Sequence, residues 1–336
     1  MIRFLSQLAL LGSASVFISY DPASLESHYG ALEWARSRIQ FSTLKTGLLV
    51  LIGLKFARTL SSFFNAVALN NWRLPATKDW DWPSEIAVVT GGCNGIGKAV
   101  VVGLAQKGLK VAVLDMSDLP EDLAGLDNVS YWKCDITSQT AVSETADGIR
   151  RSLGHPSILV NNAGIAHEHT VLETTHEELE RIFSVNIISH WLTTKEFLPE
   201  MISKNKGHLV TVTSMSSYVP LPKSVDYSAT KAGLLAFHLG LSSEIKHVYK
   251  APGIMSSIVH PMWVETKMTK KRAARSEKAR QAMMQPQDVA QKILDQIFSC
   301  CGGQILLPSN GTWLTAIHGF PNWFQELIRD LAAKRR

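Results

Sequence analysis

The feature that most constrains this chain is a buried strand, a glycine-rich turn and a helix in immediate succession. The run Ile86–Thr90 is short and apolar, which is typical of a strand covered on both faces. The turn at 91–97 is rich in glycine, and apolar residues then recur at helical spacing from Val100 to Leu104. Glycines let a backbone approach a pyrophosphate, and the amino end of a helix supplies N–H groups and a positive dipole. The sequence therefore predicts a dinucleotide-binding turn.

The alternation of strand and helix continues beyond this turn. Short apolar runs predict further strands at 110–115, 129–134, 157–161, 207–213, 254–260 and 304–307. Helical patterns lie between them, at 138–153, 173–198, 227–249 and 287–298. This order favours right-handed crossovers and a parallel sheet with helices on both faces. We predict an α/β fold, a Rossmann-like doubly wound parallel sheet, as one domain at 81–310. A hydrophobic extension at 1–80 and an amphipathic aromatic segment at 311–336 flank it.

The second predicted strand ends in an acidic residue, Asp115, about 20 residues after the glycine turn. A carboxylate at this place accepts hydrogen bonds from the adenosine ribose hydroxyls and repels a 2′-phosphate. Neither Asn94 nor Met116 is a cation that could hold such a phosphate. The sequence therefore favours NAD(H), with NADP(H) as the alternative.

A tyrosine and a lysine, Tyr227 and Lys231, share one face of the predicted helix at 227–249. A cation beside a phenol favours the phenolate, so we expect Lys231 to lower the pKa of Tyr227 from about 10. Tyr227 would then serve as a general acid or base. Surface helices often carry such a pair, so its meaning depends on the rest of the chain.

Short motifs of one enzyme family follow one another in order along residues 85–307. They are the glycine turn after Thr90, Asp115, Asp135, the run from Asn161 to Gly164, Asn186, Ser214, the Tyr227/Lys231 pair and the run from Pro261 to Thr266. In this order and spacing the chain resembles the short-chain dehydrogenase/reductase family. The resemblance implies an NAD(P)-dependent enzyme that moves a hydride to or from a CH–OH or C=O group.

The resemblance also implies catalytic roles. Tyr227 would exchange a proton with the substrate oxygen, and Ser214 would hydrogen-bond the same oxygen. Lys231 would lower the pKa of Tyr227 and hold the nicotinamide ribose. Asn186, through its helix and a water, would link Lys231 to solvent as a proton relay. The neighbouring Ser216 and Ser217 are further hydroxyls, so the choice of Ser214 rests on spacing.

The cofactor contacts that the resemblance implies lie at the ends of the predicted strands. Asp115 would meet the ribose, Asp135 the adenine, and Asn162 would line the groove. Val264 and Thr266 would seat the nicotinamide carboxamide. The full set expected to contact the cofactor is Gly91, Asn94, Gly95, Ile96, Gly97, Asp115, Asp135, Asn162, Tyr227, Lys231, Val264 and Thr266. One departure is Met262, where the family usually has glycine, and this weakens any inference about pocket shape.

Two apolar tracts precede the catalytic domain. The first, at 4–20, carries no charge but is marginal in length for a membrane span, and a cleaved signal peptide is the alternative. The second, at 44–69, is interrupted by Lys45, Lys55 and Arg58, which favours a helix lying in the membrane interface. Trp72, Trp80 and Trp82 follow, and tryptophan favours the headgroup level. An extension packed on the domain is the other interpretation.

The last segment also has an amphipathic pattern. From Pro321 onward, apolar residues fall on one helical face and basic residues end the chain. Such a helix could cover the substrate entrance, anchor the protein at a lipid surface, or both.

Composition excludes several other classes. The formal net charge is +5, with no run of basic residues interleaved with aromatics, so we expect no nucleic-acid partner. The four cysteines include no CxxC, which favours reduced thiols facing the cytosol. We expect no metal site, because His167 and His169 lack an evident third ligand and read as a loop at the substrate rim.

These features lead to one favoured function and two alternatives. The extension and the run from His260 to Thr266 resemble the membrane-associated branch of the family, including fungal relatives, which acts on retinoid, steroid or long-chain alcohols at the endoplasmic reticulum or lipid droplets. We therefore expect a small hydrophobic substrate, which could also be polyketide-like, and, by analogy, a homodimer. An NADPH-dependent carbonyl reductase of a biosynthetic pathway is the first alternative. A non-catalytic cofactor sensor or scaffold is the second.

Overall fold

The computed structural model describes residues 41–75, 77–274 and 276–334. The chain forms two compact units, Met1–Ala68 and Leu69–Arg336. The apolar tract expected at 4–20 lies outside the described residues. The second unit holds all the strands that the structure describes. It begins at Leu69, before the boundary near residue 80 at which the sequence analysis divided the chain.

A seven-stranded sheet forms the centre of the second unit, with the strand order β3-β2-β1-β4-β5-β6-β7. Every neighbouring pair is parallel. The strands are β1 (Ile86–Thr90), β2 (Lys110–Asp115), β3 (Val129–Lys133), β4 (Ile158–Asn161), β5 (Gly207–Val212), β6 (Ile254–Pro261) and β7 (Gly303–Leu307). The predicted α/β fold with a doubly wound parallel sheet is confirmed, and each strand begins and ends within one residue of its predicted range.

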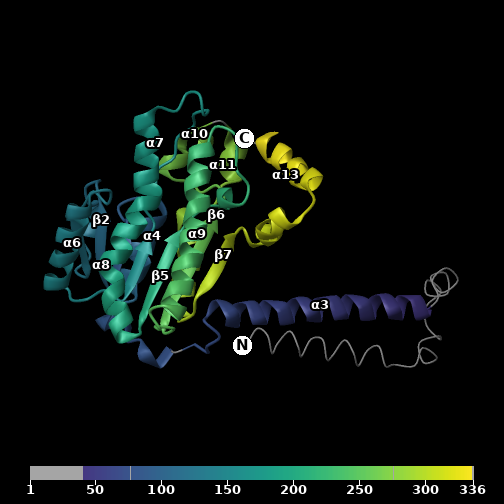
Figure 1. Cartoon of the computed structure of the whole chain (residues 1–336), viewed down its shortest axis with the longest axis horizontal. Coiled ribbons are helices and arrows are strands. Elements are labelled where there is room, and N and C mark those ends of the chain that lie inside the picture. Colours follow the sequence, from purple (N-terminus) through teal and green to yellow (C-terminus); the bar gives the residue numbers. More distant parts are fainter. Residues whose placement is uncertain (1–40, 76, 275, 335–336) are drawn as a thin grey trace. The chain divides into compact units, whose positions relative to one another are not determined.

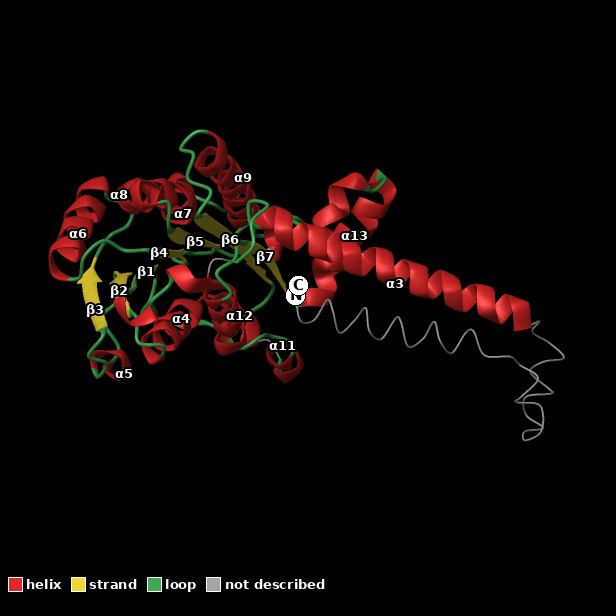
Figure 2. Cartoon of the chain, turned by 90° about the horizontal axis from the view of Figure 1, so that it is seen from below, coloured by secondary structure: helices red, strands yellow, loops and turns green. Residues whose placement is uncertain are grey.

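Helices cover both faces of this sheet (Figure 2). On one face lie α6 (Gln139–Ser152), α7 (His176–Phe183), α8 (Ser189–Lys204) and α9 (Val225–His247). The other face carries α4 (Gly95–Gln106) and α12 (Pro286–Phe298), with the short α5 (Glu121–Ala124), α10 (Lys270–Ala273) and α11 (Glu277–Gln281) nearby. Short helical turns complete the unit: η2 (Thr77–Asp79), η3 (Trp82–Ser84), η4 (Ser184–Ile188), η5 (Met215–Ser217) and η6 (Lys267–Thr269).

Each face of the sheet buries its own apolar core. Val89 and Val113 pack with Leu104 of α4 and Ile293 of α12. The alternate residues of the same strands, among them Val88, pack against α6 and α8. Successive side chains of a strand point to opposite faces, so strands buried on both faces become nearly continuous apolar runs. This is why the sequence located them so closely.

The predicted helix at 173–198 is interrupted. Helix α7 starts at a capping box in which Thr175 and Glu178 bond each other's backbone, and it ends at the π-helical turn η4, before α8. A π-helical turn inserts a residue into the helical register and often marks a functional position. Here the turn contains Asn186.

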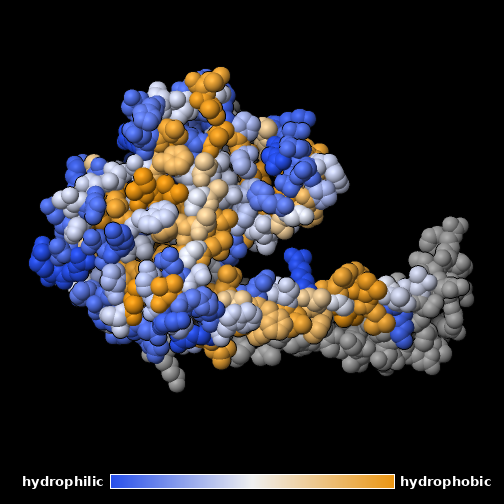
Figure 3. All heavy atoms as spheres, in the orientation of Figure 1, coloured by the Kyte–Doolittle hydropathy of each residue, from blue (hydrophilic) through white to orange (hydrophobic). Residues whose placement is uncertain are grey.

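In the first unit the structure describes helix α3 (Phe41–Leu69) up to the unit boundary (Figure 1). Its stretch Lys45–Leu69 is long and apolar enough to cross a membrane by length and composition. Hydrophobic residues are prominent along it in Figure 3, and Leu51 and Leu54 are more than 60% exposed. At about 1.5 Å per residue, this stretch exceeds the roughly 30 Å of a bilayer core. Its length therefore permits a span, whereas the position in the membrane interface that the sequence favoured stays a prediction.

The connection after α3 is bound to the sheet domain. The Asn70 side chain accepts a hydrogen bond from the Gly302 N–H at 3.0 Å, and the Asn71 amide donates to the Pro252 and Ile254 carbonyls at 3.2 Å each. These contacts lie at the amino ends of β6 and β7. The chain therefore enters the domain at the edge opposite to the carboxyl ends of the strands.

Trp80 and Trp82 pack within the domain. Their rings stack with centroids 5.2 Å apart, and Trp82 meets Phe298 of α12 edge-on at 4.8 Å. The Lys206 ammonium lies 4.8 Å from the Trp80 ring. The expectation that these two tryptophans lie at the headgroup level is therefore wrong, whereas Trp72 is 61% exposed.

The C-terminal segment folds as the long 3-10 turn η7 (Ser309–Gly319) and helix α13 (Asn322–Lys334). Leu314, Phe324 and Ile328 pack against a small core that includes Met215 and Tyr218. The segment is thereby held beside η5, at the carboxyl ends of the strands.

Candidate active site

A pocket of about 1320 Å³ opens at the carboxyl ends of the strands. Its lining runs from the glycine turn after β1, past the ends of β2, β4, β5 and β6, to α7, η7 and α13. The strand order reverses between β1 and β4, and ligands of open α/β sheets bind at such a switch point. All the predicted catalytic residues except the buried Asn186 line this pocket.

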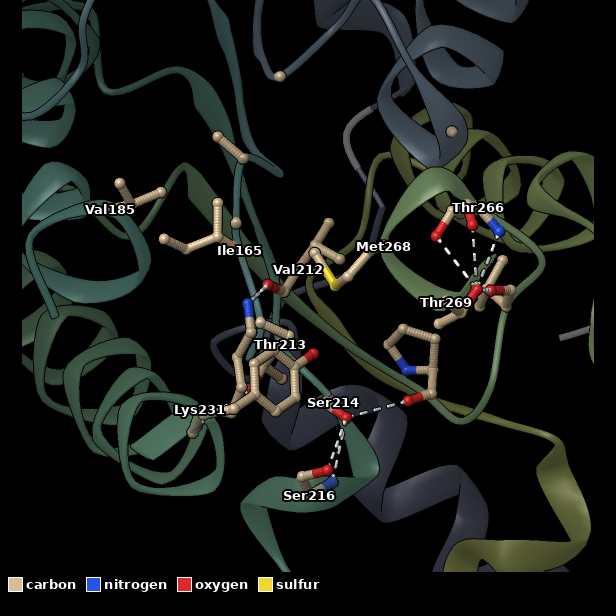
Figure 4. A pocket seen from close by; sticks show the side chains of 18 of the residues that line it. Ile165, Val185, Val212, Thr213, Ser214, Ser216, Lys231, Thr266, Met268 and Thr269 are labelled. Carbon is tan, nitrogen blue, oxygen red and sulfur yellow. Dashed lines mark hydrogen bonds between the residues drawn. The ribbon is translucent and has the colours of Figure 1, made fainter. Parts of the chain in front are cut away.

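Tyr227 and Lys231 lie one turn apart on α9, with the Lys231 Nζ atom 5.6 Å from the centre of the Tyr227 ring. Lys231 is 4% exposed, and its ammonium donates a hydrogen bond to the Val212 carbonyl at 3.2 Å (Figure 4). Burial disfavours the charged ammonium and lowers the pKa of Lys231 to about 8. Lys231 therefore loses its positive charge as the pH rises through about 8.

Burial also raises the pKa of the Tyr227 phenol, and a hydrogen bond with Ser214 opposes this increase. The sequence argument expected Lys231 to lower that pKa. The expected direction of the pKa shift was wrong, because burial removes the phenolate from water. The resulting increase in pKa is larger than the decrease that the contact with Ser214 causes. The neutral phenol is thus favoured, in contact with the Ser214 hydroxyl.

Ser214 precedes the turn η5, and its hydroxyl is held in place by neighbours (Figure 4). It accepts a hydrogen bond from the Ser216 N–H at 3.1 Å and lies 3.4 Å from the Pro261 carbonyl. The Ser217 hydroxyl instead donates to the Ser214 carbonyl and lies 3.0 Å from His260 Nδ1. Ser214 and Ser216 line the pocket together with Tyr227, and Ser214 is the serine whose hydroxyl lowers the pKa of Tyr227. The catalytic role chosen for Ser214 from spacing stays a prediction.

Asn186 is fully buried in η4, and its side chain joins three elements. Its oxygen accepts from the Ile165 N–H at 2.8 Å, while its amide donates to the Ile165 carbonyl at 2.9 Å and to Thr230 Oγ1 at 3.1 Å. The loop after β4 passes close to both side chains at Gly164. A Cβ placed there would lie 3.3 Å from the Asn186 oxygen and 3.4 Å from Lys231 Nζ. Asn186 therefore fixes the loop after β4 against α9; its role in a proton relay stays a prediction.

The glycine turn is shaped by close backbone approach. Gly91 and Gly95 have φ values of +65° and +54°, a region that favours glycine. A Cβ on Gly97 would lie 2.2 Å from the Gly91 carbonyl oxygen. Gly91, Asn94, Gly95 and Ile96 line the pocket, and Gly97 lies in the first turn of α4, which begins at Gly95. The turn therefore leaves its backbone open to a ligand at the amino end of α4.

Polar side chains brace this turn from two strands. Asn162 donates to the Thr90 carbonyl at 3.0 Å and to the Gly91 carbonyl at 3.1 Å. Asp115 accepts from the Cys93 N–H and from the Ser117 N–H, each at 2.9 Å. Sequence reasoning assigned Asp115 to the ribose and missed that it also holds the turn. The carboxylate is thus fixed at the end of β2.

The remaining predicted cofactor residues also line the pocket. The Asp135 carboxylate accepts from the Thr137 N–H at 2.9 Å and from its hydroxyl at 2.7 Å. Val264 is buried, and the Thr266 N–H donates to Thr269 Oγ1 at 3.0 Å. A Cβ on Gly95 would lie 3.0 Å from the Thr266 methyl carbon, so the segment after β6 faces the glycine turn. These groups fit a dinucleotide lying along the carboxyl edge of the sheet.

Sequence reasoning missed most of the residues at the other end of the pocket. Apolar side chains from three segments line it: Met262, Trp263, Met268, Trp313, Leu314, Ile328 and Leu331. The departure at Met262 and the amphipathic pattern after Pro321 were the signals in the sequence for parts of this wall. The C-terminal helix does lie at the pocket, whereas its role as a lipid anchor stays a prediction.

A doubly wound sheet, a glycine turn at its switch point and a Ser/Tyr/Lys group beside it define a nucleotide-dependent α/β oxidoreductase. The family model for "short chain dehydrogenase" matches residues 85–277. The chain belongs to the short-chain dehydrogenase/reductase family and is an NAD(P)-dependent oxidoreductase.

Curated relatives and solved structures agree with this family. Dehydrogenase RED2 of Cochliobolus heterostrophus is 36% identical over 259 residues, which cover 76% of this chain and 95% of that protein. The human 17-beta-hydroxysteroid dehydrogenase 13 is 30% identical over 197 residues, which cover 57% and 65% of the two chains. The ligand-free aldohexose dehydrogenase of Thermoplasma acidophilum shares the fold, with a TM-score of 0.59 at 22% identity, over 66% of this chain and 92% of that one.

Proposed function

We propose that this protein is a membrane-associated dehydrogenase that uses NAD⁺ to oxidise a hydrophobic secondary or long-chain alcohol. The observation that carries the proposal is the apolar wall of the pocket. Met262 and Met268 from the segment after β6, and Trp313, Ile328 and Leu331 from the C-terminal segment, line the same cavity as Tyr227. A cavity of this kind, mostly apolar with a few convergent polar groups, suits a small hydrophobic ligand.

The catalytic groups act on one oxygen of that ligand. Tyr227 takes the proton of the substrate hydroxyl as the phenolate, the form that burial disfavours and that the charged Lys231 beside it stabilises. The Ser214 hydroxyl holds the same oxygen and stabilises its developing charge. Lys231 holds the nicotinamide ribose, and Asn186 with its helix leads the proton to solvent. Bound NAD⁺ supplies the hydride acceptor.

The preference for NAD(H) over NADP(H) rests on Asp115. Its carboxylate is fixed by two backbone N–H groups at the end of β2. A carboxylate fixed at this place accepts hydrogen bonds from the ribose hydroxyls of NAD(H) and repels the 2′-phosphate of NADP(H). Both cofactors are compared directly in the experiment below.

The membrane association rests on helix α3 and the exposed aromatic side chains of the C-terminal segment. The 25-residue stretch of α3 is long enough to span, and Trp313 and Trp323 are 46% and 70% exposed. We place the catalytic domain on the cytosolic side of the endoplasmic reticulum or a lipid droplet. The full chain should float with phosphatidylcholine vesicles, whereas residues 69–336 alone should float less; equal recovery of both would contradict an anchor in α3.

The partner proposed for the domain is a second copy of itself. Ile188 and Trp191 before and within α8, and Leu239 in α9, are apolar and about half exposed. These helices surround the catalytic group, and pairing through them would cover the apolar surface. Light scattering of the detergent-solubilised chain measures the oligomeric state, and a monomer at micromolar concentration would contradict the proposal.

The activity is tested with the purified full chain, NAD⁺ or NADP⁺, and a panel of retinoid, steroid and fatty alcohols. We expect NADH to form with at least one apolar alcohol and to form faster than NADPH. The matched ketones with NADH and NADPH measure the reverse reaction. Cofactor binding without turnover of any alcohol or ketone in the panel would refute the proposed function.

A further inference from the structure

One part of the pocket wall is polar. His167 and Glu168, from the loop after β4, line it together with Glu177, Glu180 and Arg181 of α7. None of these residues belongs to the catalytic or cofactor set. The same cavity therefore offers polar groups as well as an apolar surface to a ligand.

His167 is paired with a buried acid that directly precedes the catalytic tyrosine. Its Nδ1 atom lies 3.5 Å from Asp226 Oδ2, and the two side chains are 20% and 6% exposed. Both atoms are buried and have no hydrogen-bond partner of good geometry. The other Asp226 oxygen accepts from the Tyr227 N–H at 2.7 Å. A buried carboxylate is costly unless paired, so Asp226 orients the His167 ring.

The orientation of this ring leaves its second nitrogen for a ligand. With Nδ1 turned to Asp226, Nε2 lies on the opposite edge of the ring, and His167 lines the pocket. An aspartate beside Nδ1 favours the tautomer that carries its proton there, which makes Nε2 a hydrogen-bond acceptor.

We propose that His167, oriented by Asp226, binds a second hydroxyl group of the substrate. The inference rests on the proposed function and narrows its substrate class from a hydrophobic alcohol to a hydrophobic diol or hydroxyketone. One substrate oxygen reacts at Tyr227, and the second hydroxyl group donates a hydrogen bond to His167 Nε2. Asp226 touches no substrate and is a positioning residue.

Charge on the same wall decides against an acidic substrate group. Glu168, Glu177 and Glu180 line the wall and Asp226 lies behind His167, whereas Arg181 is the cation of α7 that lines it. A carboxylate or phosphate would meet more negative than positive charge here. A neutral hydroxyl avoids this repulsion and can donate to the imidazole.

The test measures binding rather than turnover, so it does not depend on the proposed reaction. Straight-chain diols with increasing separation of the hydroxyls, and the matched mono-alcohols, are titrated into the full-length enzyme with NADH, where alcohols cannot be oxidised. The fluorescence of bound NADH reports binding. For the diol that fits best, we expect about tenfold tighter binding than for its mono-alcohol, equivalent to about 1.4 kcal/mol.

Two variants assign this preference to the imidazole. His167→Leu should abolish the preference for the diol, and His167→Gln, which can still accept a hydrogen bond, should restore part of it. His169→Leu is the matched control: it removes a neighbouring imidazole that pairs with Glu178 at 3.2 Å, and the preference should persist. Wild-type enzyme that shows no preference for any diol, or His167→Leu enzyme that keeps it, would overturn the inference. Neither result bears on whether apolar alcohols are oxidised.

Discussion

The two ends of the active-site pocket are built differently. At the cofactor end, the turn after β1 is shaped by glycines, and Asn162 and Asp115 bond its backbone with short, regular hydrogen bonds. At the substrate end, Met262 and Trp313 are nearly half exposed, and the buried pair of His167 and Asp226 lacks a hydrogen bond of good geometry. Hydrogen bonds within the protein hold the first end, whereas exposed apolar side chains and a weakly paired histidine form much of the second.

The two ends of the pocket also differ in whether the family model covers their residues. The family model matches residues 85–277, which include the whole cofactor end. Much of the apolar wall of the substrate end comes later, from η7 and α13. A cofactor common to a family requires one geometry, whereas each substrate requires its own. The C-terminal segment therefore carries information about the substrate that the shared domain lacks.

The largest expected effect separates chemistry from binding. Tyr227→Phe removes the hydroxyl that exchanges the proton but keeps the ring. We expect turnover to fall about 1000-fold, within the usual range for losing a general acid or base. Cofactor affinity should fall far less, because Tyr227 is one of many expected cofactor contacts. Steady-state kinetics and NADH titration measure the two quantities.

Tyr218 provides the matched control for that variant. It lies outside the pocket lining, and its hydroxyl contacts the Gln304 amide at 2.6 Å. Tyr218→Phe should cost about 1 kcal/mol of stability and leave turnover unchanged. Equal losses of turnover in both variants would mean that Tyr227 acts through packing, and its catalytic role would be withdrawn.

The next effect tests the rigid cofactor end. Gly97→Ala places a methyl group 2.2 Å from the Gly91 carbonyl oxygen, so the turn must open. A forced backbone shift of this kind costs about 1–3 kcal/mol, and we expect NADH affinity to fall about 100-fold. Gly125→Ala is the control, because its nearest neighbour would be 3.8 Å away. Calorimetric titration that found the same affinity for both variants would contradict a turn closed by Gly97.

The sequence predicted the cofactor end well because the constraints there are local. A glycine turn must follow a strand and precede a helix, and an acid such as Asp115 must end the next strand. Strands buried on both faces read as apolar runs, so their ranges were accurate. The motif spacing also identified Ser214, Tyr227 and Lys231, and in the structure they do meet at one place.

The substrate end was poorly predicted because distant segments create it. Trp313 reaches the pocket through packing of the C-terminal segment on η5, which no local pattern reveals. The amphipathic pattern after Pro321 indicated only that Ile328 and its helix could cover the substrate entrance. Asp226 stands next to Tyr227 in the sequence, yet its pairing with His167 depends on the loop after β4. The pKa of Tyr227 was predicted in the wrong direction for a related reason: the spacing reveals Lys231 but not the burial.

Low pH should destabilise the part of the sheet formed by β5 and β6 before the part formed by β1, β2 and β3. Four buried histidines lie on or beside β5 and β6, whereas no buried histidine lies on β1, β2 or β3. Burial lowers the pKa of His190 and His208 to about 3 and of His238 and His260 to about 4. In the unfolded chain these groups bind protons below about 6.5.

The folded protein therefore binds fewer protons than the unfolded chain between about pH 6.5 and 4, and stability falls as the pH is lowered through this window. Each histidine contributes up to about 1.4 kcal/mol per pH unit. Urea unfolding across the window measures the slope, and hydrogen exchange should speed up in β5 and β6 before β1 and β2. Stability that is independent of pH in this range would contradict neutral buried histidines.

The smallest effect asks whether Asp115 acts by its charge or by its hydrogen bonds. Asp115→Asn keeps an oxygen that can accept from the Cys93 N–H but removes the negative charge facing the ribose. We expect the ratio of NADP⁺ to NAD⁺ affinity to rise about fivefold, a change of about 1 kcal/mol, because the repulsion of the 2′-phosphate is lost. Asp118→Asn is the control, since its side chain is 97% exposed on the following loop. If affinity for both cofactors fell together, Asp115 would serve mainly to hold the glycine turn, and the basis for preferring NAD(H) would be lost.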